Sequence, residues 1–201
     1  YNGTRILSAR AIYENTRNIL NLLDSLSQRF GQVFSMVDVG GGMGIPYFGR
    51  DKALDKTELE MLMKPLFTEF HARFPKARII MESGRFIAGT AGCFVSRINN
   101  IKSNYGETFL VTDGGTHCHM SATGVGQVVR RNFPMQNLSA EGEGEPERYQ
   151  VTGPLCNPDD LTARNIDLPV SRVGDLIAIT SSGAYGPSAS PELIHSQGHP
   201  A

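Results

Sequence analysis

Two short apolar runs in the first half of the chain each end in a cluster of small and polar residues. Val37-Asp38-Val39 leads into Gly40-Gly41-Gly42, and Ile79-Ile80-Met81 leads into Glu82-Ser83-Gly84-Arg85. Glycine N–H groups can surround a phosphate without obstruction from side chains. The pattern therefore predicts two strand ends that offer an anion site with a carboxylate and a guanidinium beside it.

Apolar residues recur at helical spacing in two segments that alternate with these strands. One helix is expected over residues 12–30, ended by Gly31. A second is expected to open at Thr57, in the capping-box pattern Thr57-Glu58-Leu59-Glu60, and to be kinked or interrupted near Pro65. The alternation predicts parallel βα units, whose ligands lie at the carboxyl ends of the strands.

After about residue 92 the pattern changes to short β-like runs separated by glycine, proline and asparagine turns. These runs cover residues 94–101, 108–112, 148–152 and 175–180. We therefore predict an α/β domain over residues 1–91, followed by a mostly β domain over residues 92–201.

Charge and composition exclude several classes of partner. Lysine and arginine number 19 against 20 aspartate and glutamate, a formal net charge of -1, so no net field attracts nucleic acid or an anionic membrane. No apolar run approaches the ~20 residues of a membrane span, and the first residues do not resemble a signal peptide. The odd number of cysteines, three without CxxC spacing, fits reduced thiols. We expect a cytoplasmic protein whose partners are small molecules or proteins.

The glycine and carboxylate clusters are also compatible with simpler roles. Counted from Gly40, the run GGGMGI lacks the sixth-position glycine of the dinucleotide fingerprint, which disfavours that class of site. The glycines could form only a tight turn, and Glu82 could serve only as an ion-pair partner of Arg85; both possibilities stay open. No metal site is predicted, because the residues of His117-Cys118-His119 would alternate between the faces of an extended segment.

Four separated motifs occur in an order that covers nearly the whole chain: Asp38-Val39-Gly40-Gly41-Gly42, Glu82-Ser83-Gly84-Arg85, Gly153-Pro154-Leu155-Cys156 and Ser182-Gly183-Ala184-Tyr185-Gly186. Together they resemble the fold-type III pyridoxal-phosphate decarboxylases, which include the diaminopimelate and ornithine decarboxylases. The resemblance implies the C-terminal part of a (βα)8 barrel over residues 1–91, a barrel-like β domain over residues 92–201, and pyridoxal 5'-phosphate at the barrel mouth.

The resemblance also implies roles for individual residues. It assigns the cofactor phosphate to Gly40, Gly41, Gly42, Gly84, Arg85 and Tyr185. Glu82 would face the pyridine nitrogen, where a carboxylate favours the protonated ring that accepts electrons during decarboxylation. Racemases of the same fold place an arginine there instead. Cys156 would return a proton to the substrate carbon in the partner subunit's site of a homodimer, whereas Cys93 and Cys118 are expected to be small core residues.

Departures from the family pattern bear on the substrate. The residue after the family cysteine is usually acidic and binds a distal ammonium group, but here it is the neutral Asn157. A buried cation without a carboxylate would be costly, so we expect a substrate whose distal amine is absent or masked, unless Asp159, Asp160 or Asp113 compensates. The runs at 112–115, 126–134 and 183–191 resemble a subgroup that includes exosortase-associated members and decarboxylases acting on an amino acid tethered to a carrier protein. In that setting, Arg130 or Arg131 would bind a substrate carboxylate or a carrier phosphopantetheine. The predicted substrate-binding residues are Asp113, Arg131 and Asn157.

The lysine that family members use to bind the cofactor lies on an early strand. The lysines at 52, 56, 64, 76 and 102 match no such motif. The resemblance therefore implies that this chain acts together with the N-terminal half of the same enzyme. The alternatives are a non-catalytic partner of a true decarboxylase, a pyridoxal-phosphate-binding or phosphate-binding fragment, and an amino-acid racemase of the same fold.

Overall fold

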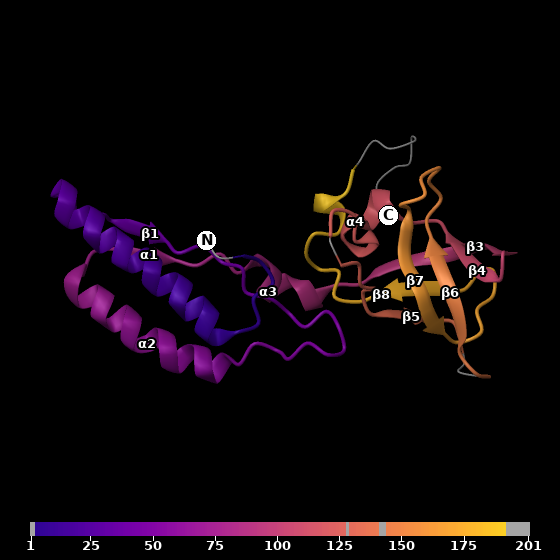
Figure 1. The fold of residues 1–201 in the computed structure, drawn as a ribbon, viewed down its shortest axis with the longest axis horizontal. Helices are drawn as coiled ribbons and strands as arrows, with labels where there is room; N and C mark the ends of the chain where they lie inside the picture. The colour runs from indigo at the N-terminus through magenta and orange to yellow at the C-terminus, as the bar shows by residue number, and fades with distance from the viewer. Residues whose placement is uncertain (1–2, 128, 141–143, 192–201) are drawn as a thin grey trace. The chain divides into compact units, whose positions relative to one another are not determined.

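The chain divides into two units, Tyr1–Ile87 and Ala88–Ala201. The computed structural model describes residues 3–127, 129–140 and 144–191 (Figure 1). In the first unit, helix α1 (Ala9–Phe30) begins after Ser8, whose hydroxyl oxygen accepts a hydrogen bond from the Ala11 N–H. It ends at Gly31 with φ +61°, a left-handed conformation that glycine adopts without steric cost. The predicted end of this helix is confirmed.

The second helix, α2 (Lys56–Arg73), differs from its prediction in two respects. Its N-cap is Asp55 and not Thr57, because the Asp55 carboxylate accepts hydrogen bonds from the N–H groups of Thr57 and Glu58. The predicted interruption near Pro65 is wrong, since the helix continues on both sides of it. Proline removes one backbone donor, and the burial of Met63 and Phe70 on either side holds the helix in place.

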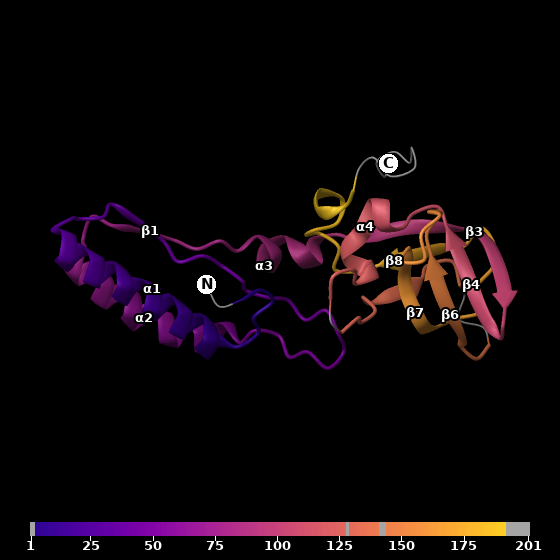
Figure 2. The same ribbon diagram turned by 45° about the horizontal axis from the view of Figure 1, so that its top comes forward.

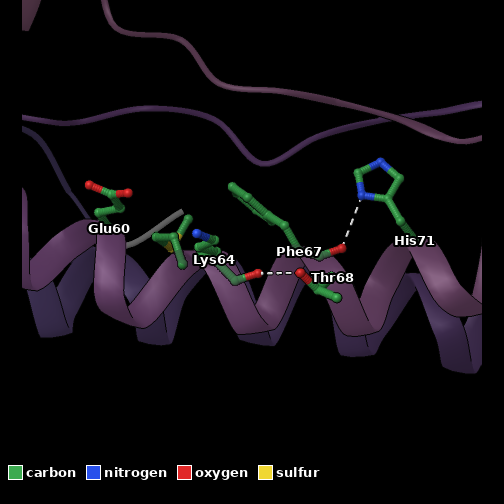
Figure 3. Close-up of a pocket in the computed structure, with 6 residues that line it drawn as sticks. Glu60, Lys64, Phe67, Thr68 and His71 are labelled. Carbon is green, nitrogen blue, oxygen red and sulfur yellow. Dashed lines mark hydrogen bonds between the residues drawn. The ribbon is translucent and has the colours of Figure 1, made fainter.

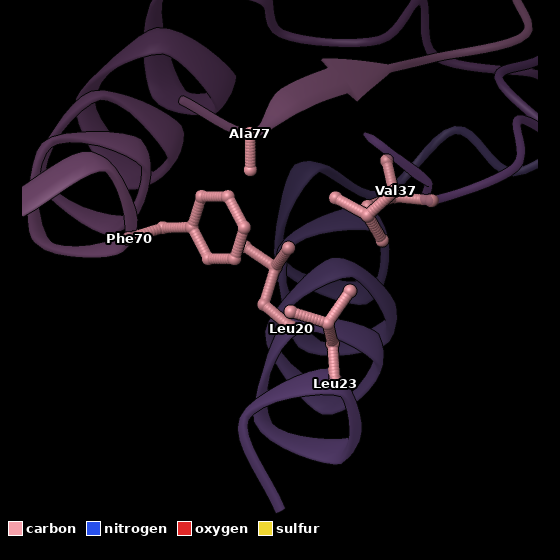
Figure 4. Close-up of a cluster of buried hydrophobic side chains, with 6 residues drawn as sticks. Leu20, Leu23, Val37, Phe70 and Ala77 are labelled. Atoms are coloured by element: carbon pink, nitrogen blue, oxygen red, sulfur yellow. The ribbon is translucent and has the colours of Figure 1, made fainter. Parts of the chain in front are cut away.

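A parallel pair of strands, β1 (Met36–Asp38) and β2 (Arg78–Ile80), aligns Asp38 with Ile80. This confirms the predicted parallel pairing. Helices α1 and α2 lie side by side along the strands (Figure 2). Between helices and strands lies an apolar core whose buried members are Leu20, Leu23, Val37, Val39, Phe70 and Ala77 (Figure 4). Other apolar side chains of β1 and β2 lie outside this core: Met36 is 48% exposed and Ile80 is 39% exposed.

The second unit is built on a six-stranded mixed sheet in the order β5-β8-β3-β4-β6-β7. The strands are β3 (Phe94–Asn104), β4 (Glu107–Thr112), β5 (Met135–Asn137), β6 (Glu147–Thr152), β7 (Leu161–Leu168) and β8 (Leu176–Ile179). Among these six described strands, β4 and β6 pair in parallel and the other neighbours pair antiparallel. The four predicted β runs are confirmed as β3, β4, β6 and β8, whereas β5 and β7 were not predicted.

The two end strands of this sheet, β5 and β7, are linked by one side chain. Asn132, just before β5, donates its amide N–H to the Arg164 carbonyl (2.6 Å) and accepts the Arg164 N–H at its amide oxygen (2.9 Å). The Asn132 amide thus makes the two hydrogen bonds to Arg164 that the backbone of a neighbouring strand would make. Because this links the two ends of the sheet, the mixed sheet is nearly closed.

A short helix, α4 (Thr116–Thr123), occupies a segment that we expected to be extended. That expectation is wrong for His117-Cys118-His119: the segment is helical apart from His119, which has φ -148° and ψ 66°. Cys118 is buried as predicted, and burial raises the pKa of its thiol. Cys93 is exposed, so its expected place in the core is wrong.

His119 lies at the centre of the packing around α4. It is fully buried, and the rings of Phe94 and Phe133 meet it edge-on with centroids 5.8 and 5.6 Å away. Its Nε2 atom is 2.8 Å from the Ser182 hydroxyl, which itself donates to the Ile179 carbonyl, so the imidazole N–H must be the donor of the first bond. Burial lowers the pKa of His119 to about 4.

The Leu20 side chain tests the core of the first unit. Leu20→Ala should lower the free energy of unfolding by about 3 kcal/mol, because it leaves a cavity where Leu20 is 1% exposed. Urea denaturation followed by circular dichroism measures the loss. Leu22→Ala, on the same helix at 58% exposure, is the control and should change stability by less than about 0.5 kcal/mol. Equal losses in the two variants would contradict the described core.

The His119 imidazole predicts how stability depends on pH. Its pKa is lower in the folded chain than the ordinary value of 6.5, so its contribution to stability is complete above pH 6.5 and is lost as the pH falls toward 4. This loss should amount to about 3 kcal/mol, measured by urea denaturation between pH 7.5 and 4. His119→Leu should remove most of it, whereas His71→Leu on the exposed side of α2 should keep it. A steep pH dependence that survives in His119→Leu would show that another group is responsible.

Candidate functional site

The glycine loop after β1 is packed directly against Glu82 after β2. The Glu82 N–H donates to the Gly40 carbonyl (2.8 Å), and the Gly40 N–H donates to the Asp38 carboxylate (2.8 Å). A Cβ atom on Gly41 would overlap the Glu82 carbonyl oxygen, so a side chain there would displace the Glu82 backbone. Gly40 and Gly42 have φ values of +70° and +87°, which also favour glycine. The carboxyl ends of both strands therefore meet at one point.

The rest of the loop is clamped by residues near the start of the chain. The Gly42 carbonyl accepts the Ile6 N–H (2.8 Å), and the Gly44 N–H donates to the Ile6 carbonyl (2.9 Å). A Cβ atom on Gly44 would come within 2.7 Å of the Arg5 backbone. Within the part of the chain that the structure describes, no residue accepts a hydrogen bond from the N–H groups of Gly41 and Gly42. Two donors on a fixed loop are thus available to a ligand.

The Glu82 carboxylate is exposed, and it forms no hydrogen bond or ion pair with any residue in the described ranges. Arg85, in the short helix α3 (Gly84–Ala88), instead donates to the hydroxyl of the buried Tyr47 (2.9 Å), with its guanidinium 5.6 Å from the centre of that ring. The structure therefore does not support a role for Glu82 as an ion-pair partner of Arg85. Glu82 presents an uncompensated negative charge beside the glycine loop.

In the second unit, the loop that carries Cys156 is fixed by a fully buried carboxylate, Asp160. One oxygen accepts the N–H (2.6 Å) and hydroxyl (2.7 Å) of Thr116 at the start of α4, and the other accepts the Leu155 N–H (2.8 Å). Space for this carboxylate exists because Gly115 and Gly153 lack side chains: a Cβ on either would collide with it. The exposed Cys156 thiol directly follows Leu155, so its position is set by this contact.

Helix α4 also holds the loop that carries Tyr185. The Ser121 hydroxyl donates to the Tyr185 carbonyl (2.8 Å), and the Met120 N–H donates to the Ser190 hydroxyl (2.9 Å). Together with the bond from His119 to Ser182, these contacts anchor the loop at both ends. Tyr185 itself is 48% exposed and has φ +59°, which is unusual for a residue with a side chain.

The positioning roles of Asp160 and α4 were missed in the sequence. Asp160 follows another aspartate in a polar turn, and nothing in the sequence distinguishes the buried carboxylate from the exposed one. The local signal for α4 is Gly124, which follows Thr123 and ends the helix with φ +68°.

The three predicted substrate-binding residues all lie in the second unit, as do Cys156 and Tyr185. One Asp113 carboxylate oxygen accepts the Arg97 N–H (2.8 Å), and the Asn157 amide oxygen accepts the Asp159 N–H (3.0 Å). Arg131 lines a cavity of about 290 Å³. The structure thus packs the glycine loop against Glu82 in the first unit, and it places Asp113, Cys156, Asn157, Arg131 and Tyr185 in the second unit.

A second hollow, of about 620 Å³, lies along α2 and is lined by Glu60, Met63, Lys64, Phe67, Thr68 and His71 (Figure 3). It contains none of the predicted site residues. Among the described residues, no group of three or more histidine, cysteine, aspartate or glutamate side chains could hold a metal ion. In those same ranges, every helix is too short or too polar to cross a membrane.

Comparison with known proteins identifies the family to which this chain belongs. Residues 9–183 match the family model described as the pyridoxal-dependent decarboxylase, C-terminal sheet domain. The chain is 35% identical to the L-glutamyl-(BtrI acyl-carrier protein) decarboxylase of Niallia circulans, covering 100% of this chain and 47% of that protein. It is 30% identical to the diaminopimelate decarboxylase of Archaeoglobus fulgidus, covering 92% of this chain and 42% of that protein.

Solved structures show the same fold. The crystal structure of diaminopimelate decarboxylase from M. jannaschii superimposes with a TM-score of 0.80 at 24% identity, covering 94% of this chain and 42% of that one. This chain therefore spans less than half the length of each of these three relatives. From the family model and these relatives, we conclude that the chain belongs to the pyridoxal-dependent decarboxylases.

Proposed function

We propose that this chain supplies the cofactor-facing groups of a pyridoxal-phosphate-dependent amino-acid decarboxylase. The observation that carries the proposal is the contact between Gly41 and Glu82. It joins two N–H donors and a carboxylate, none of which has a partner among the described residues, at the ends of neighbouring strands. Pyridoxal phosphate has complementary groups, a phosphate at one end and a basic ring nitrogen at the other, so these residues fit the cofactor. Gly40, Gly84, Arg85 and Tyr185 complete the proposed phosphate site.

Glu82 determines which reaction this site favours. When bound, the cofactor's pyridine ring takes up the electrons that are released as the substrate loses its carboxylate. The Glu82 carboxylate stabilises the protonated ring nitrogen and thereby strengthens that electron uptake. This supports decarboxylation over racemisation, for which an arginine at the nitrogen is expected.

Cys156 is the proposed proton donor. Its thiol is exposed, while the loop that carries it is fixed by the buried Asp160. In the proposed step, the thiol proton passes from Sγ to the carbon that has lost carbon dioxide, and solvent then reprotonates the thiolate. We propose that the thiol serves the site of a partner subunit in a homodimer.

The first unit is proposed to be the last part of a (βα)8 barrel, over residues 1–91, with the sheet domain following over residues 92–201. The parallel β1–β2 pair and the partly exposed Met36 and Ile80 support this proposal, since further strands would cover such side chains. The chain matches less than half of the length of these relatives. This supports the proposal that an N-terminal half contributes the remaining barrel strands and the cofactor-binding lysine.

The proposed substrate is an amino-acyl group tethered to a carrier protein. The neutral Asn157 disfavours a substrate with a free distal ammonium, and its amide oxygen is already bonded to the Asp159 N–H. The relative at 35% identity carries a carrier-linked substrate in its name.

The proposed function is tested by combining this chain with its N-terminal half and pyridoxal phosphate. We expect the absorption band of the protein-bound cofactor and the release of carbon dioxide from a glutamyl group on an acyl-carrier protein. Free glutamate and diaminopimelate are the comparison substrates. Absence of the band would contradict the cofactor site. A band with carbon dioxide release only from diaminopimelate would contradict the carrier-bound substrate, and a band without any release would favour a racemase or a non-catalytic partner.

Glu82→Gln tests the role of the carboxylate in this assembly. The variant should keep the cofactor band and lose activity on the order of 100-fold, because the amide cannot stabilise a protonated ring nitrogen. Single-turnover measurements of carbon dioxide release follow the chemical step. Glu14→Gln, an exposed carboxylate of α1, is the matched control and should retain full activity. A fully active Glu82→Gln variant would exclude the proposed role.

Cys156→Ala tests the proton donor. It should lower the rate of product formation on the order of 100-fold while leaving the cofactor band intact, since the proton must then come from water. Cys93→Ala removes another exposed thiol of the same unit and should behave as the unmodified protein. The assignment of Cys156 is wrong if the two cysteine variants have equal activity.

A further inference from the structure

A cavity of about 290 Å³ lies where the sheet is nearly closed, between β7 and the segment before β5. Ala122 and Thr123, at the end of α4, form part of its wall. Arg130, Arg131 and Arg164 also line it. We call it the arginine cavity.

The backbone around the arginine cavity is held by contacts that need no ligand. The Asn132 amide makes both of its hydrogen bonds to the backbone of Arg164, across the gap between the end strands. On the other side, a Cβ atom on Gly124 would lie 3.2 Å from Cγ of Arg130, so the turn after α4 packs closely on that arginine. The backbone that carries the three arginines is therefore held in place by contacts within the protein.

The guanidinium groups around the arginine cavity differ in how far their charge is offset. Arg130 is paired with Asp159 at 3.0 Å, so its charge is offset by a carboxylate. The Arg164 guanidinium has no hydrogen-bond or ion-pair partner among residues 3–127, 129–140 and 144–191. A guanidinium without an acceptor attracts an anion that enters the cavity, and the neighbouring arginines can add further N–H donors to it.

We propose that the arginine cavity binds the phosphate group of a phosphate ester. The planar guanidinium matches phosphate oxygens with paired hydrogen bonds, and phosphate has enough oxygens for more than one arginine, whereas one arginine satisfies a carboxylate. The cavity adjoins the loop of the proposed proton donor, because Asp159, the partner of Arg130, lies three residues after Cys156. The phosphate source that we infer is the phosphodiester of a carrier protein's pantetheine arm. This last identification rests on the proposed function; the phosphate site does not.

Calorimetric titration of the protein, joined with its N-terminal half and saturated with pyridoxal phosphate, tests this site while the cofactor's own phosphate site is filled. The probes are phosphopantetheine, pantetheine without phosphate, and inorganic phosphate. Phosphopantetheine should bind at least about 10-fold more tightly than pantetheine. Arg164→Gln should remove this difference, and Arg164→Lys should restore part of it, because lysine keeps the charge without the planar fork. Arg172→Gln, in the exposed turn after β7, is the control and should bind as the unmodified protein.

The possible results separate the phosphate site from its ligand and from the proposed function. Equal binding of phosphopantetheine to the Arg164→Gln and Arg172→Gln variants, with both sheets intact by circular dichroism, would overturn the phosphate site. Inorganic phosphate that binds as tightly as phosphopantetheine, and that also needs Arg164, would support the site but assign it to free phosphate. Failure of the proposed function would appear differently: carbon dioxide release would be absent while phosphate binding still depended on Arg164 and not on Glu82.

Discussion

The contact of Gly41 with the backbone of Glu82 is the constraint on which the candidate site depends. Because a Cβ atom on Gly41 would overlap the Glu82 carbonyl oxygen, the ends of β1 and β2 can approach only with glycine at this position. The bond from the Glu82 N–H to the Gly40 carbonyl continues the parallel ladder beyond the strands themselves. A carboxylate and a loop whose N–H donors have no acceptor in the described part of the chain are thereby fixed side by side.

In the second unit, glycines again allow a close approach, but the group that they admit is a carboxylate side chain and not a backbone carbonyl. Asp160 is fully buried, and its carboxylate joins the start of α4 to the Cys156 loop through hydrogen bonds to Thr116 and Leu155. A buried carboxylate is tolerated because its oxygens are satisfied by N–H and O–H donors. Here too a close approach of glycines, Gly115 and Gly153, makes the space. In both units the loops that carry candidate residues are therefore set by backbone proximity and not by flexible side chains.

The elements that were predicted correctly are those with a local signal in the sequence, either apolar residues at helical spacing or a short β-like run between turn residues. Helices α1 and α2 pack apolar residues against β1 and β2, and β3, β4, β6 and β8 contain β-branched or aromatic residues and are bounded by turns. Helix α4 was missed because most of its residues are buried and it is held by hydrogen bonds to distant segments, such as that of Thr116 to Asp160 at its start and that of His119 to Ser182 in its middle. Strand β7 contains Arg164, Asn165 and Asp167, with φ +48° at Asn165, so it lacks strand-like alternation. The sequence motifs identified the residues of the candidate site. The partners that fix these residues could not be identified, because they are distant in the sequence.

The polar side chains of the candidate site fall into two classes, and this division bears on their roles. Asp113 and Asn157 already accept hydrogen bonds from the backbone, so a substrate that bound them would compete with those bonds. Glu82 has no such bond in the described part of the chain, and its charge gains most from a cationic partner. The same reasoning separates Arg130, which Asp159 neutralises, from Arg164, whose guanidinium has no such carboxylate in the described ranges. Ligand contacts are therefore expected where the fold has left a charge uncompensated, at Glu82 in the first unit and at Arg164 in the second.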